Sequence, residues 1–230
     1  MLVPLLIAAV VGYLLGSLPF GYLVAKAHGV DIFKVGSGNP GATNVKRVLG
    51  SGAGNTVYCL DALKGAVATG WPIVFALLFA RVPYTGDPWS GFLIAVIGHQ
   101  NAVCLTGLVC AVLGHSFSVF TRFKGGKGVA TASGGLLVLM WAAILIGTVV
   151  WFAAYFAWRY VSLASIVAAI VVPAAAWIIG YSLLLKIVVT LLGALVIVRH
   201  HANIRRLLAG TENRFDRPRV PSPHDQARDH

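Results

Sequence analysis

Long apolar stretches, separated by short polar segments, dominate the sequence. A helix needs about 20 apolar residues to cross the hydrocarbon core of a bilayer, and six stretches reach or approach that length. They cover residues 3–27, 54–80, 102–120, 131–159, 166–179 and 183–198. Residues 82–101 are less uniformly apolar, and we expect them to lie mainly outside the membrane, with a short interfacial piece at 92–97. The pattern predicts an all-α, polytopic membrane protein.

Composition supports this interpretation and adds a strong basic excess. The chain is 58% hydrophobic and 11% charged, and its mean hydropathy is +0.82, as is typical of membrane proteins. Lys and Arg outnumber Asp and Glu by 18 to 7, which in a soluble protein would suggest a nucleic-acid partner. The long apolar runs argue against nucleic acid. We therefore attribute the excess to membrane topology and anionic ligands.

The chain ends and the cysteines give further expectations. The first apolar run, residues 2–27, lacks a preceding basic segment and is too long for a signal peptide, so we expect it to remain as the first span. Cys59, Cys104 and Cys110 match neither a metal site nor a disulfide framework, and we interpret them as packing residues. Residues 216–230 are polar, and we expect a disordered tail after a single membrane domain of residues 1–215.

Two glycine-rich loops carry the densest polar clusters of the chain. The first, GSGNPGATN at 36–44, cannot continue a helix, and its glycines allow the positive φ values that turn successive N–H groups toward one point. The second, FKGGKGVAT at 123–131, places Lys124 and Lys127 around a Gly-Gly pair. Backbone N–H groups arranged in this way form anion nests. Two such loops, edged by cations, imply a phosphate ligand.

The distribution of basic residues predicts how the bundle is oriented. If both glycine loops, the polar segment at 160–165 and the C-terminal tail share one side, the other side keeps only Arg81 and Lys186. The positive-inside rule then places the loops and the C-terminus in the cytoplasm and the N-terminus outside. This topology requires an odd number of crossings. Seven fits if 130–140 is a short element that turns back through 141–158, and five fits if that region does not fully cross; we favour seven.

Polar residues inside the predicted spans allow two interpretations each. Ser17 and Pro19 interrupt the first span, either as a tolerated break or so that Ser17 faces the cavity of the glycine loops. Asp61 and Lys64 are three residues apart, so they share a helix face and can neutralise each other. They form either a structural ion pair or a pair that orients loop residues. His115 lies shortly before the second glycine loop.

The predicted cytoplasmic face is rich in hydrogen-bond donors and poor in acids. Its polar residues are Ser37, Asn39, Thr43, Asn44, Arg47, His115, Lys124, Lys127, Ser162, His200, Asn203 and Arg206. The nearby carboxylates are only Asp31, Asp61 and Glu212. This shortage disfavours a two-carboxylate hydrolase and a carboxylate metal site, and we expect neither a metal nor a cofactor. A donor-rich pocket suits a dianionic phosphate.

Several common catalytic motifs are missing outside the polar tail. Residues 1–215 contain no GxxxxGK[ST], no GxSxG and no HxxxxD sequence. The first absence gives no support for ATP binding through a P-loop. The other two disfavour a covalent serine mechanism and a histidine–aspartate acyltransferase. We therefore expect direct attack by a bound hydroxyl, with hydrogen-bond donors that stabilise the oxyanion.

The chain resembles the bacterial acyl-phosphate:glycerol-3-phosphate acyltransferases, the PlsY family, in six segments that occur in that family's order. They are GSLPFG, GSGNPGATN, LDALKG, LGHSFSVFTRFKGGKGVAT, YVSLASI and RHHANIRRLLAGTE, and they run from Gly16 to Glu212. The resemblance implies seven helices in the bacterial inner membrane and a cytoplasmic active site. It also implies acyl transfer from acyl phosphate to the 1-hydroxyl of glycerol 3-phosphate, the first acylation of phospholipid synthesis, which gives lysophosphatidic acid and phosphate.

The motif match implies roles for individual residues. Glycerol 3-phosphate would be held by Ser37, Arg47, Lys127, His200 and Asn203. Acyl phosphate would be held by Lys124 and the backbone of Gly125, Gly126, Lys127 and Gly128. The expected catalytic residues are Ser165, Asn39, His200 and Lys127. The rest of the expected site consists of residues that complete or support the loops: Gly38, Gly41, Thr43, Asn44, Ser17, Asp61, Lys64, His115, Ser162, Arg206 and Glu212.

Two questions stay open at this stage. The proton of the attacking hydroxyl can go to His115, to His200 or to the phosphate of the bound substrate, and we favour the phosphate. A transporter of a phosphorylated metabolite would share the bundle and the basic loops, but it would normally show an internal repeat and polar groups near the midplane of several spans. Neither is present in the sequence, so transport is the second choice.

Overall fold

The computed structural model describes residues 1–215, and the secondary structure of this part is helical. Its helices are α1 (Leu2–Ser17), α2 (Phe20–Ala27), α3 (Ala42–Leu49), α4 (Ser51–Phe79), α5 (Pro88–Gly98), α6 (Gln100–Ser116), α7 (Val129–Trp158), α8 (Val161–Ile179), α9 (Leu183–Arg199) and α10 (His201–Leu208). A short 3-10 helix at Val119–Thr121 precedes the second glycine loop. The predicted disordered tail lies outside the described residues.

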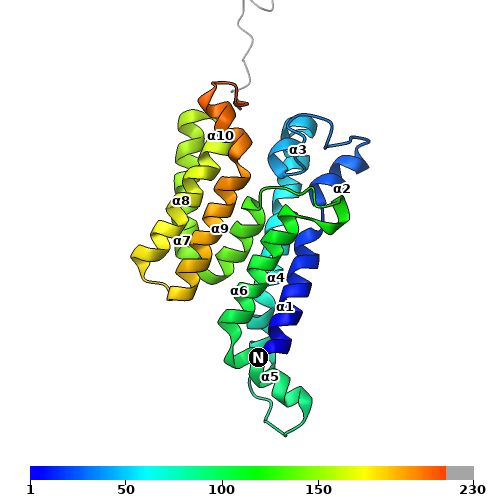
Figure 1. Cartoon of the computed structure of the whole chain (residues 1–230), viewed down its shortest axis with the longest axis vertical. Helices are drawn as coiled ribbons and strands as arrows, with labels where there is room; N and C mark the ends of the chain where they lie inside the picture. The colour runs from blue at the N-terminus through cyan, green and yellow to red at the C-terminus, as the bar shows by residue number, and fades with distance from the viewer. Residues whose placement is uncertain (216–230) are drawn as a thin grey trace, which may run out of the picture.

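In the described part of the chain, the long helices run along the long axis of the molecule (Figure 1). They are α1 continued by α2, then α4, α6, the two arms of α7, α8 and α9. The N-terminus lies at one end beside α5, and α10 lies at the other end (Figure 1). A described chain that starts at one end of the bundle and has α10 at the other requires an odd number of crossings between them. The predicted all-α fold of about seven membrane helices is confirmed.

The helix α7 is folded back on itself. Met140 has φ −150° and ψ 54°, which are not helical values, and it divides α7 into two arms. A straight helix of 30 residues would be about 45 Å long, yet Val129 and Tyr155, near its two ends, line the same cavity. The first arm therefore leads away from the second glycine loop and the second arm returns to it. This is the turn near residue 140 on which the prediction of seven crossings depended.

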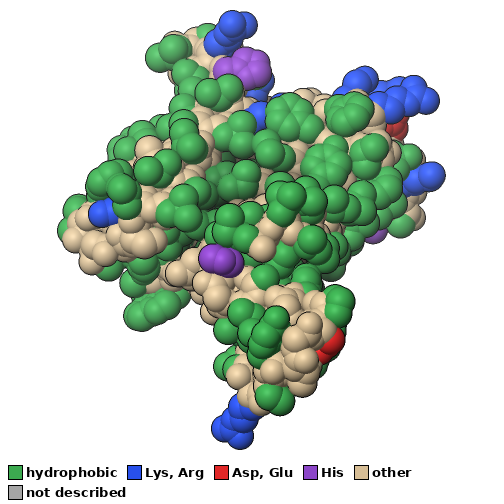
Figure 2. Space-filling view, turned by 60° about the horizontal axis from the view of Figure 1, so that its bottom comes forward, with side chains coloured by type: hydrophobic (Ala, Val, Ile, Leu, Met, Phe, Trp, Pro, Cys, Tyr) green, Lys and Arg blue, Asp and Glu red, His purple; other side chains and the backbone are tan. Residues whose placement is uncertain are grey.

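The surface of the bundle has the apolar character of a membrane protein. Within residues 1–215, five helical segments, including α1 together with α2, are each long and apolar enough to span a bilayer, and α9 joins them when it is counted with the bent α10. Large side chains remain exposed, for example Leu77 at 79% and Ile178 at 85%. Figure 2 shows hydrophobic side chains over most of one face, with Lys and Arg at its margins. Such a surface suits contact with lipid.

A buried ion pair holds the break between α1 and α2. The break falls at Leu18 and Pro19, and the Leu18 carbonyl accepts a hydrogen bond from Lys64 Nζ at 2.8 Å. Lys64 Nζ is also 2.7 Å from Asp61 Oδ1, and both side chains are only 3% exposed. A buried charge pair is tolerated when further hydrogen bonds complete it. The predicted ion pair therefore exists, and it serves the interrupted first span.

Glycines set the close spacing of the helices near the loops. A Cβ on Gly16 would lie 2.1 Å from the carbonyl oxygen of Ala111, and a Cβ on Gly65 would lie 2.0 Å from that of Thr131. Glycine alone permits α1 to approach α6, and α4 to approach the first arm of α7, at this distance.

Several helix boundaries differ from the predictions. Helix α8 begins at Val161 rather than at 166, because the helix accommodates its serines: Ser165 Oγ donates to the Val161 carbonyl at 2.8 Å. The short apolar piece is the longer helix α5, because Asp87 caps its first turn. Helix α6 begins at Gln100, directly after α5.

Candidate active site

One large cavity opens where the two glycine loops meet. Its volume is about 430 Å³, and it lies at the end of the bundle that carries α3 and α10 (Figure 1). The first wall is built by the first glycine loop, α3 and the start of α4. The opposite wall is built by the second glycine loop, α8, α10 and the segment that follows α10.

Asn44 organises the first wall from inside. Its side chain is buried, its Oδ1 accepts the Ser37 N–H at 2.8 Å, and its Nδ2 donates to the carbonyls of Ile32 and Val35 at 3.4 and 3.1 Å. Arg47 Nη1 donates to the same Oδ1 at 3.4 Å. The side-chain oxygen and nitrogen of Asn44 are thus both engaged within the protein. Asn44 therefore holds Ser37 and Arg47 in place.

The first loop has the backbone that its glycines predicted. Gly36 and Gly38 adopt φ values of +60° and +68°, a region that strongly favours glycine. Asn39 Oδ1 accepts the Gly41 N–H at 2.9 Å, which closes a tight turn. The residues of this loop and of α3 that line the cavity include Ser37, Asn39, Gly41, Thr43, Asn44 and Arg47. Gly38 shapes the loop but does not line the cavity.

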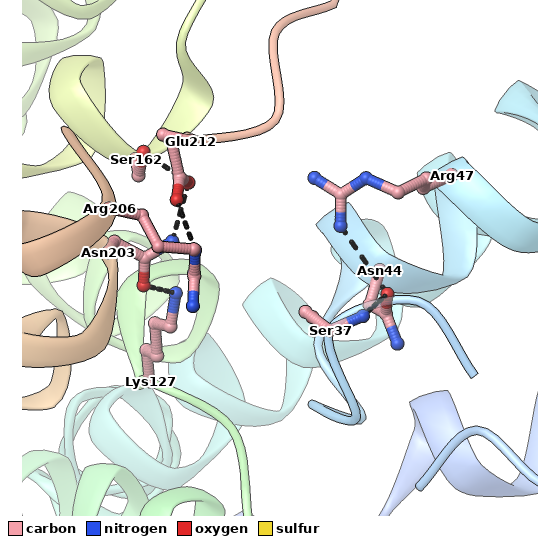
Figure 3. A network of polar contacts seen from close by, with 8 residues as sticks. All are labelled: Ser37, Asn44, Arg47, Lys127, Ser162, Asn203, Arg206 and Glu212. Atoms are coloured by element: carbon pink, nitrogen blue, oxygen red, sulfur yellow. Dashed lines mark hydrogen bonds and ion pairs between the residues drawn. The ribbon is translucent and has the colours of Figure 1, made fainter. Parts of the chain in front are cut away.

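A continuous chain of polar contacts forms the opposite wall (Figure 3). Lys127 Nζ donates to Asn203 Oδ1 at 2.5 Å, and Asn203 Nδ2 donates to Glu212 Oε1 at 2.7 Å. The Glu212 carboxylate also accepts hydrogen bonds from Ser162 Oγ at 2.8 Å and from Arg206 Nε at 2.7 Å. Figure 3 shows this group facing the first wall across a gap. Residues from three distant segments of the chain therefore meet at one place.

The cations of the site are only partly neutralised. Burial and the neighbouring arginines lower the pKa of Lys127 to about 8, although the charge of Glu212 opposes this shift. Burial would raise the pKa of Glu212, but the hydrogen bonds that it accepts hold this pKa below its usual value. Several cations share one ionised carboxylate on this wall. An added dianion would therefore be stabilised here.

His200 reaches the cavity one residue beyond the end of α9. Its Nδ1 is 2.7 Å from the Val196 carbonyl oxygen and is therefore the protonated nitrogen of the neutral ring. Nε2 is then an acceptor. Burial, together with the Lys127 ammonium, lowers the pKa of His200 to about 4. The imidazole is neutral at physiological pH and weakly basic.

Below the polar walls, the cavity continues as an apolar groove. Ser165 marks the transition, and its hydroxyl donates to the Val161 carbonyl at 2.8 Å and accepts from Trp151 Nε1 at 3.2 Å. The deeper lining comes mainly from the second arm of α7 and from α8: Ile144, Gly147, Thr148, Phe152, Ala168 and Val172. One cavity therefore joins a cationic, donor-rich mouth to an apolar groove.

The second glycine loop divides its residues between two cavities. Lys127 and Gly128 line the large cavity, and Gly128 has φ +82°. Five residues that were predicted for the site line a separate small cavity instead: Ser17, Lys64, Lys124, Gly125 and Gly126. Asp61 and His115 line both cavities. Substrate binding by Lys124, Gly125 and Gly126, and a supporting role of Ser17 and Lys64, stay predictions.

The predictions did not include a polar face of α4. Asn55 and Tyr58 line the large cavity together with Asp61. Residues at this three-residue spacing share one face of a helix, so the periodicity of polar positions was a signal for them. Phe215 also lines the cavity, where the Arg47 guanidinium lies 5.4 Å from the centre of its ring. No local sequence pattern marks Phe215. Within residues 1–215, no three His, Cys, Asp or Glu side chains are grouped as metal ligands.

Comparison with known proteins gives a consistent result. The sequence profile of the glycerol-3-phosphate acyltransferase family matches residues 6–210. The glycerol-3-phosphate acyltransferase of Mesorhizobium japonicum is 42% identical over 212 residues, which cover 92% of this chain and 96% of the relative. The corresponding protein of Aquifex aeolicus is 41% identical over 210 residues, which cover 91% and 98%.

Two crystal structures of PlsY, an integral membrane glycerol 3-phosphate acyltransferase, have the same fold. Its glycerol 3-phosphate form is 39% identical with a TM-score of 0.77, and the match covers 92% of this chain and 96% of that one. Its lysophosphatidic acid form is 38% identical with a TM-score of 0.75, and the match covers 92% and 95%. The resemblance of the six segments is thereby confirmed, and the chain belongs to the glycerol-3-phosphate acyltransferase family of integral membrane enzymes.

Proposed function

We propose that this protein transfers a fatty acyl group from acyl phosphate to the 1-hydroxyl of glycerol 3-phosphate, giving 1-acyl-glycerol 3-phosphate and inorganic phosphate. The observation that carries this proposal is the single cavity that joins two facing donor-rich walls to an apolar groove. The hydrogen-bond donors of the two facing walls suit two phosphate groups, and the groove suits one acyl chain. PlsY structures in glycerol 3-phosphate and lysophosphatidic acid forms support the choice of acceptor and product.

The acceptor is placed between the walls. Ser37 and Arg47 on one side, and Lys127, His200 and Asn203 on the other, are the groups that would hold glycerol 3-phosphate. The Arg47 guanidinium and the Lys127 ammonium supply the two positive charges that a phosphate dianion requires. Asn203 is already bonded to Lys127 Nζ at 2.5 Å. Binding therefore uses groups whose positions are fixed before the substrate arrives.

The chemical step is a direct displacement. The acceptor hydroxyl oxygen bonds to the carbonyl carbon of acyl phosphate, the bond from that carbon to the phosphate oxygen breaks, and the hydroxyl proton passes to a phosphate oxygen. Atoms and charges then balance with monohydrogen phosphate as the leaving product. A phosphate group with a pKa of about 6 is a stronger base than His200, whose pKa is about 4. This difference supports phosphate as the proton acceptor.

The remaining predicted catalytic residues would orient the reacting groups. Asn39 lines the first wall, and its Oδ1 is held by the Gly41 N–H, so its amide nitrogen is the group available to a developing oxyanion. Ser165 lies where the polar mouth meets the groove. We place the acyl carbonyl at this junction and the acyl chain in the groove. Product can then leave sideways into the membrane.

An assay in detergent tests the proposal. The purified protein is given palmitoyl phosphate with and without glycerol 3-phosphate, and both inorganic phosphate and lysophosphatidic acid are measured. We expect phosphate release that requires both substrates. The rate should fall about 10- to 100-fold in Lys127→Ala, because the variant loses one charge-assisted contact to phosphate. Lys34→Ala is the matched control, because Lys34 is 82% exposed and pairs with Asp31 at 3.4 Å.

Two outcomes would contradict the proposal. Thiol release from acyl-CoA without phosphate release from acyl phosphate would overturn the donor and keep the acceptor. No acylated product from either donor would overturn the reaction.

A further inference from the structure

We propose that Arg199 is a positioning residue, which orients the backbone of the second glycine loop toward the bound anion without touching that anion. Arg199 is the last residue of α9, and its guanidinium points behind the loop. Nη2 donates to the carbonyls of Gly126, Gly125 and Ser116 at 2.8, 3.1 and 3.2 Å, and Nε approaches the Gly126 carbonyl at 3.3 Å. One side chain thus gathers three backbone oxygens.

The planarity of the peptide bond converts these contacts into a direction for the N–H groups. In a trans peptide, the carbonyl and the following N–H point in opposite directions. The Gly125 carbonyl points to Arg199, and the Gly126 N–H accordingly points the other way, to the His115 carbonyl at 3.1 Å. By the same rule, the Lys127 N–H points away from Arg199. Within residues 1–215, this N–H has no protein acceptor.

The charge of Arg199 also acts through these peptides. Within the described chain, no carboxylate lies within ion-pair distance of its guanidinium. Its neighbours are carbonyl dipoles and the ring of Phe117, whose centre is 5.1 Å from the guanidinium carbon. Carbonyls bound to a cation are polarised, which makes the N–H groups of the same peptides stronger donors. Arg199 therefore strengthens the Lys127 N–H as a donor to an anion.

The geometry of α9 explains how one helix end serves both sides of the loop. Arg199 lies behind the loop, and the next residue, His200, lines the large cavity. Lys127 and Gly128, which directly follow the clamped peptides, line the same cavity. On the proposed function, the anion at the loop backbone is the phosphate of the acyl donor. The inference rests on that function for the identity of the anion.

The experiment compares Arg199→Gln and Arg199→Lys with the wild-type protein, with inorganic phosphate as the probe. Its inhibition constant against palmitoyl phosphate is measured, together with KM for both substrates and the melting temperature in detergent. We expect Arg199→Gln to raise the inhibition constant and the KM for palmitoyl phosphate about tenfold, the scale of one strong hydrogen bond. Arg199→Lys should raise both about threefold, because an ammonium lacks the planar fork. The KM for glycerol 3-phosphate should change less than about twofold.

Arg205→Gln is the matched control, because Arg205 is an exposed arginine of α10; it should behave as wild type. The inference is overturned if both Arg199 variants keep the inhibition constant of phosphate within about twofold of wild type. It is also overturned if both KM values rise together with a loss of melting temperature, which indicates a general structural role. If Arg199→Gln does not fold, Arg199→Lys alone decides. A wild-type protein that uses acyl-CoA and does not bind phosphate overturns the donor, and this inference with it.

Discussion

At the scale of single residues, the Lys127 ammonium is a charge that the enzyme loses at moderately alkaline pH. Its pKa is about 8 because burial and nearby arginines disfavour the charged form. We expect kcat/KM for glycerol 3-phosphate to fall as the pH rises through about 8, because the free enzyme then loses this charge. The substrate phosphate is already a dianion above its pKa of about 6, and His200 is already neutral. A pH profile between about 6.5 and about 10 measures the effect.

The variant Lys127→Arg separates this cause from others. A guanidinium stays charged over the whole pH range. The kcat/KM of the variant, although reduced by the changed geometry, should therefore stay constant up to a pH of about 10. If kcat/KM falls at alkaline pH in Lys127→Arg as it does in the wild type, another group causes the fall.

Glu212 tunes the same lysine from a distance. Its charge raises the pKa of Lys127 against the effect of burial, and it accepts hydrogen bonds from Asn203, Ser162 and Arg206. We expect Glu212→Gln to move the alkaline limit of kcat/KM to lower pH, because removing the negative charge lowers the pKa of Lys127 further. We also expect a loss of about 10-fold in kcat/KM near neutral pH from the disturbed contacts. Asp31→Asn, at an exposed pair, is the control and should leave the pH limit unmoved.

Local signals predicted the backbone of the first glycine loop, where Gly36 and Gly38 adopt the expected positive φ values. Loop glycines and their neighbouring donors were predictable, because positive φ and dense N–H groups follow from residue type at a fixed spacing. Lys124 and Lys127 show the limit of such reasoning. They flank the same glycine pair, yet they line different cavities, because the packing of Arg199 and His115 on the loop sets its two faces. Contacts between residues so far apart in sequence cannot be predicted from local spacing.

At the scale of elements, the apolar groove between α7 and α8 is expected to limit the acyl chain. Ala168 lines this groove on α8, between the polar mouth and the deep end near Ile144. We expect Ala168→Phe to lower the rate with palmitoyl phosphate about tenfold and to spare octanoyl phosphate, because the added ring fills the path of a long chain. Competition between the two donors measures the ratio. Ile170→Phe is the control, since this residue of α8 is 56% exposed and does not line the cavity.

A loss of activity with both chain lengths in Ala168→Phe would instead place the acyl chain outside the groove. Equal rates in the variant and the wild type would do the same.

The elements were predictable to the extent that hydrophobic length determines them. The order of the spans and the turn near residue 140 follow from runs that are too long for one crossing and marginal for two. The predicted start of α8 was wrong, because Ser162 and Ser165 resemble a polar break in the sequence. In the structure, Ser165 bonds to the backbone of its own helix and Ser162 bonds to Glu212. A serine whose hydroxyl is satisfied does not end a helix.

At the scale of the whole molecule, the two ends of the bundle differ in charge. The end with α3, α10 and both glycine loops holds the large cavity and most of the basic residues of the described chain. The opposite end holds the loop between α4 and α5 and the turn before α9, with Arg81 and Lys186 as its basic residues. The positive-inside rule therefore supports a cytoplasmic active site and an outside N-terminus. We therefore expect the site to face the cytoplasm, where water-soluble glycerol 3-phosphate is available.

Cysteine labelling in bacterial spheroplasts tests this orientation. Single cysteines are introduced at Tyr84, which is 65% exposed at one end, and at Lys34, which is 82% exposed at the other, after Cys59, Cys104 and Cys110 are replaced by alanine. We expect a membrane-impermeant maleimide to label Tyr84→Cys in intact spheroplasts and Lys34→Cys only after permeabilisation. Retained acyltransferase activity shows that each variant is folded. The reverse labelling pattern would place the site outside the cell, and the basic excess around the cavity would then reflect its phosphate ligands alone.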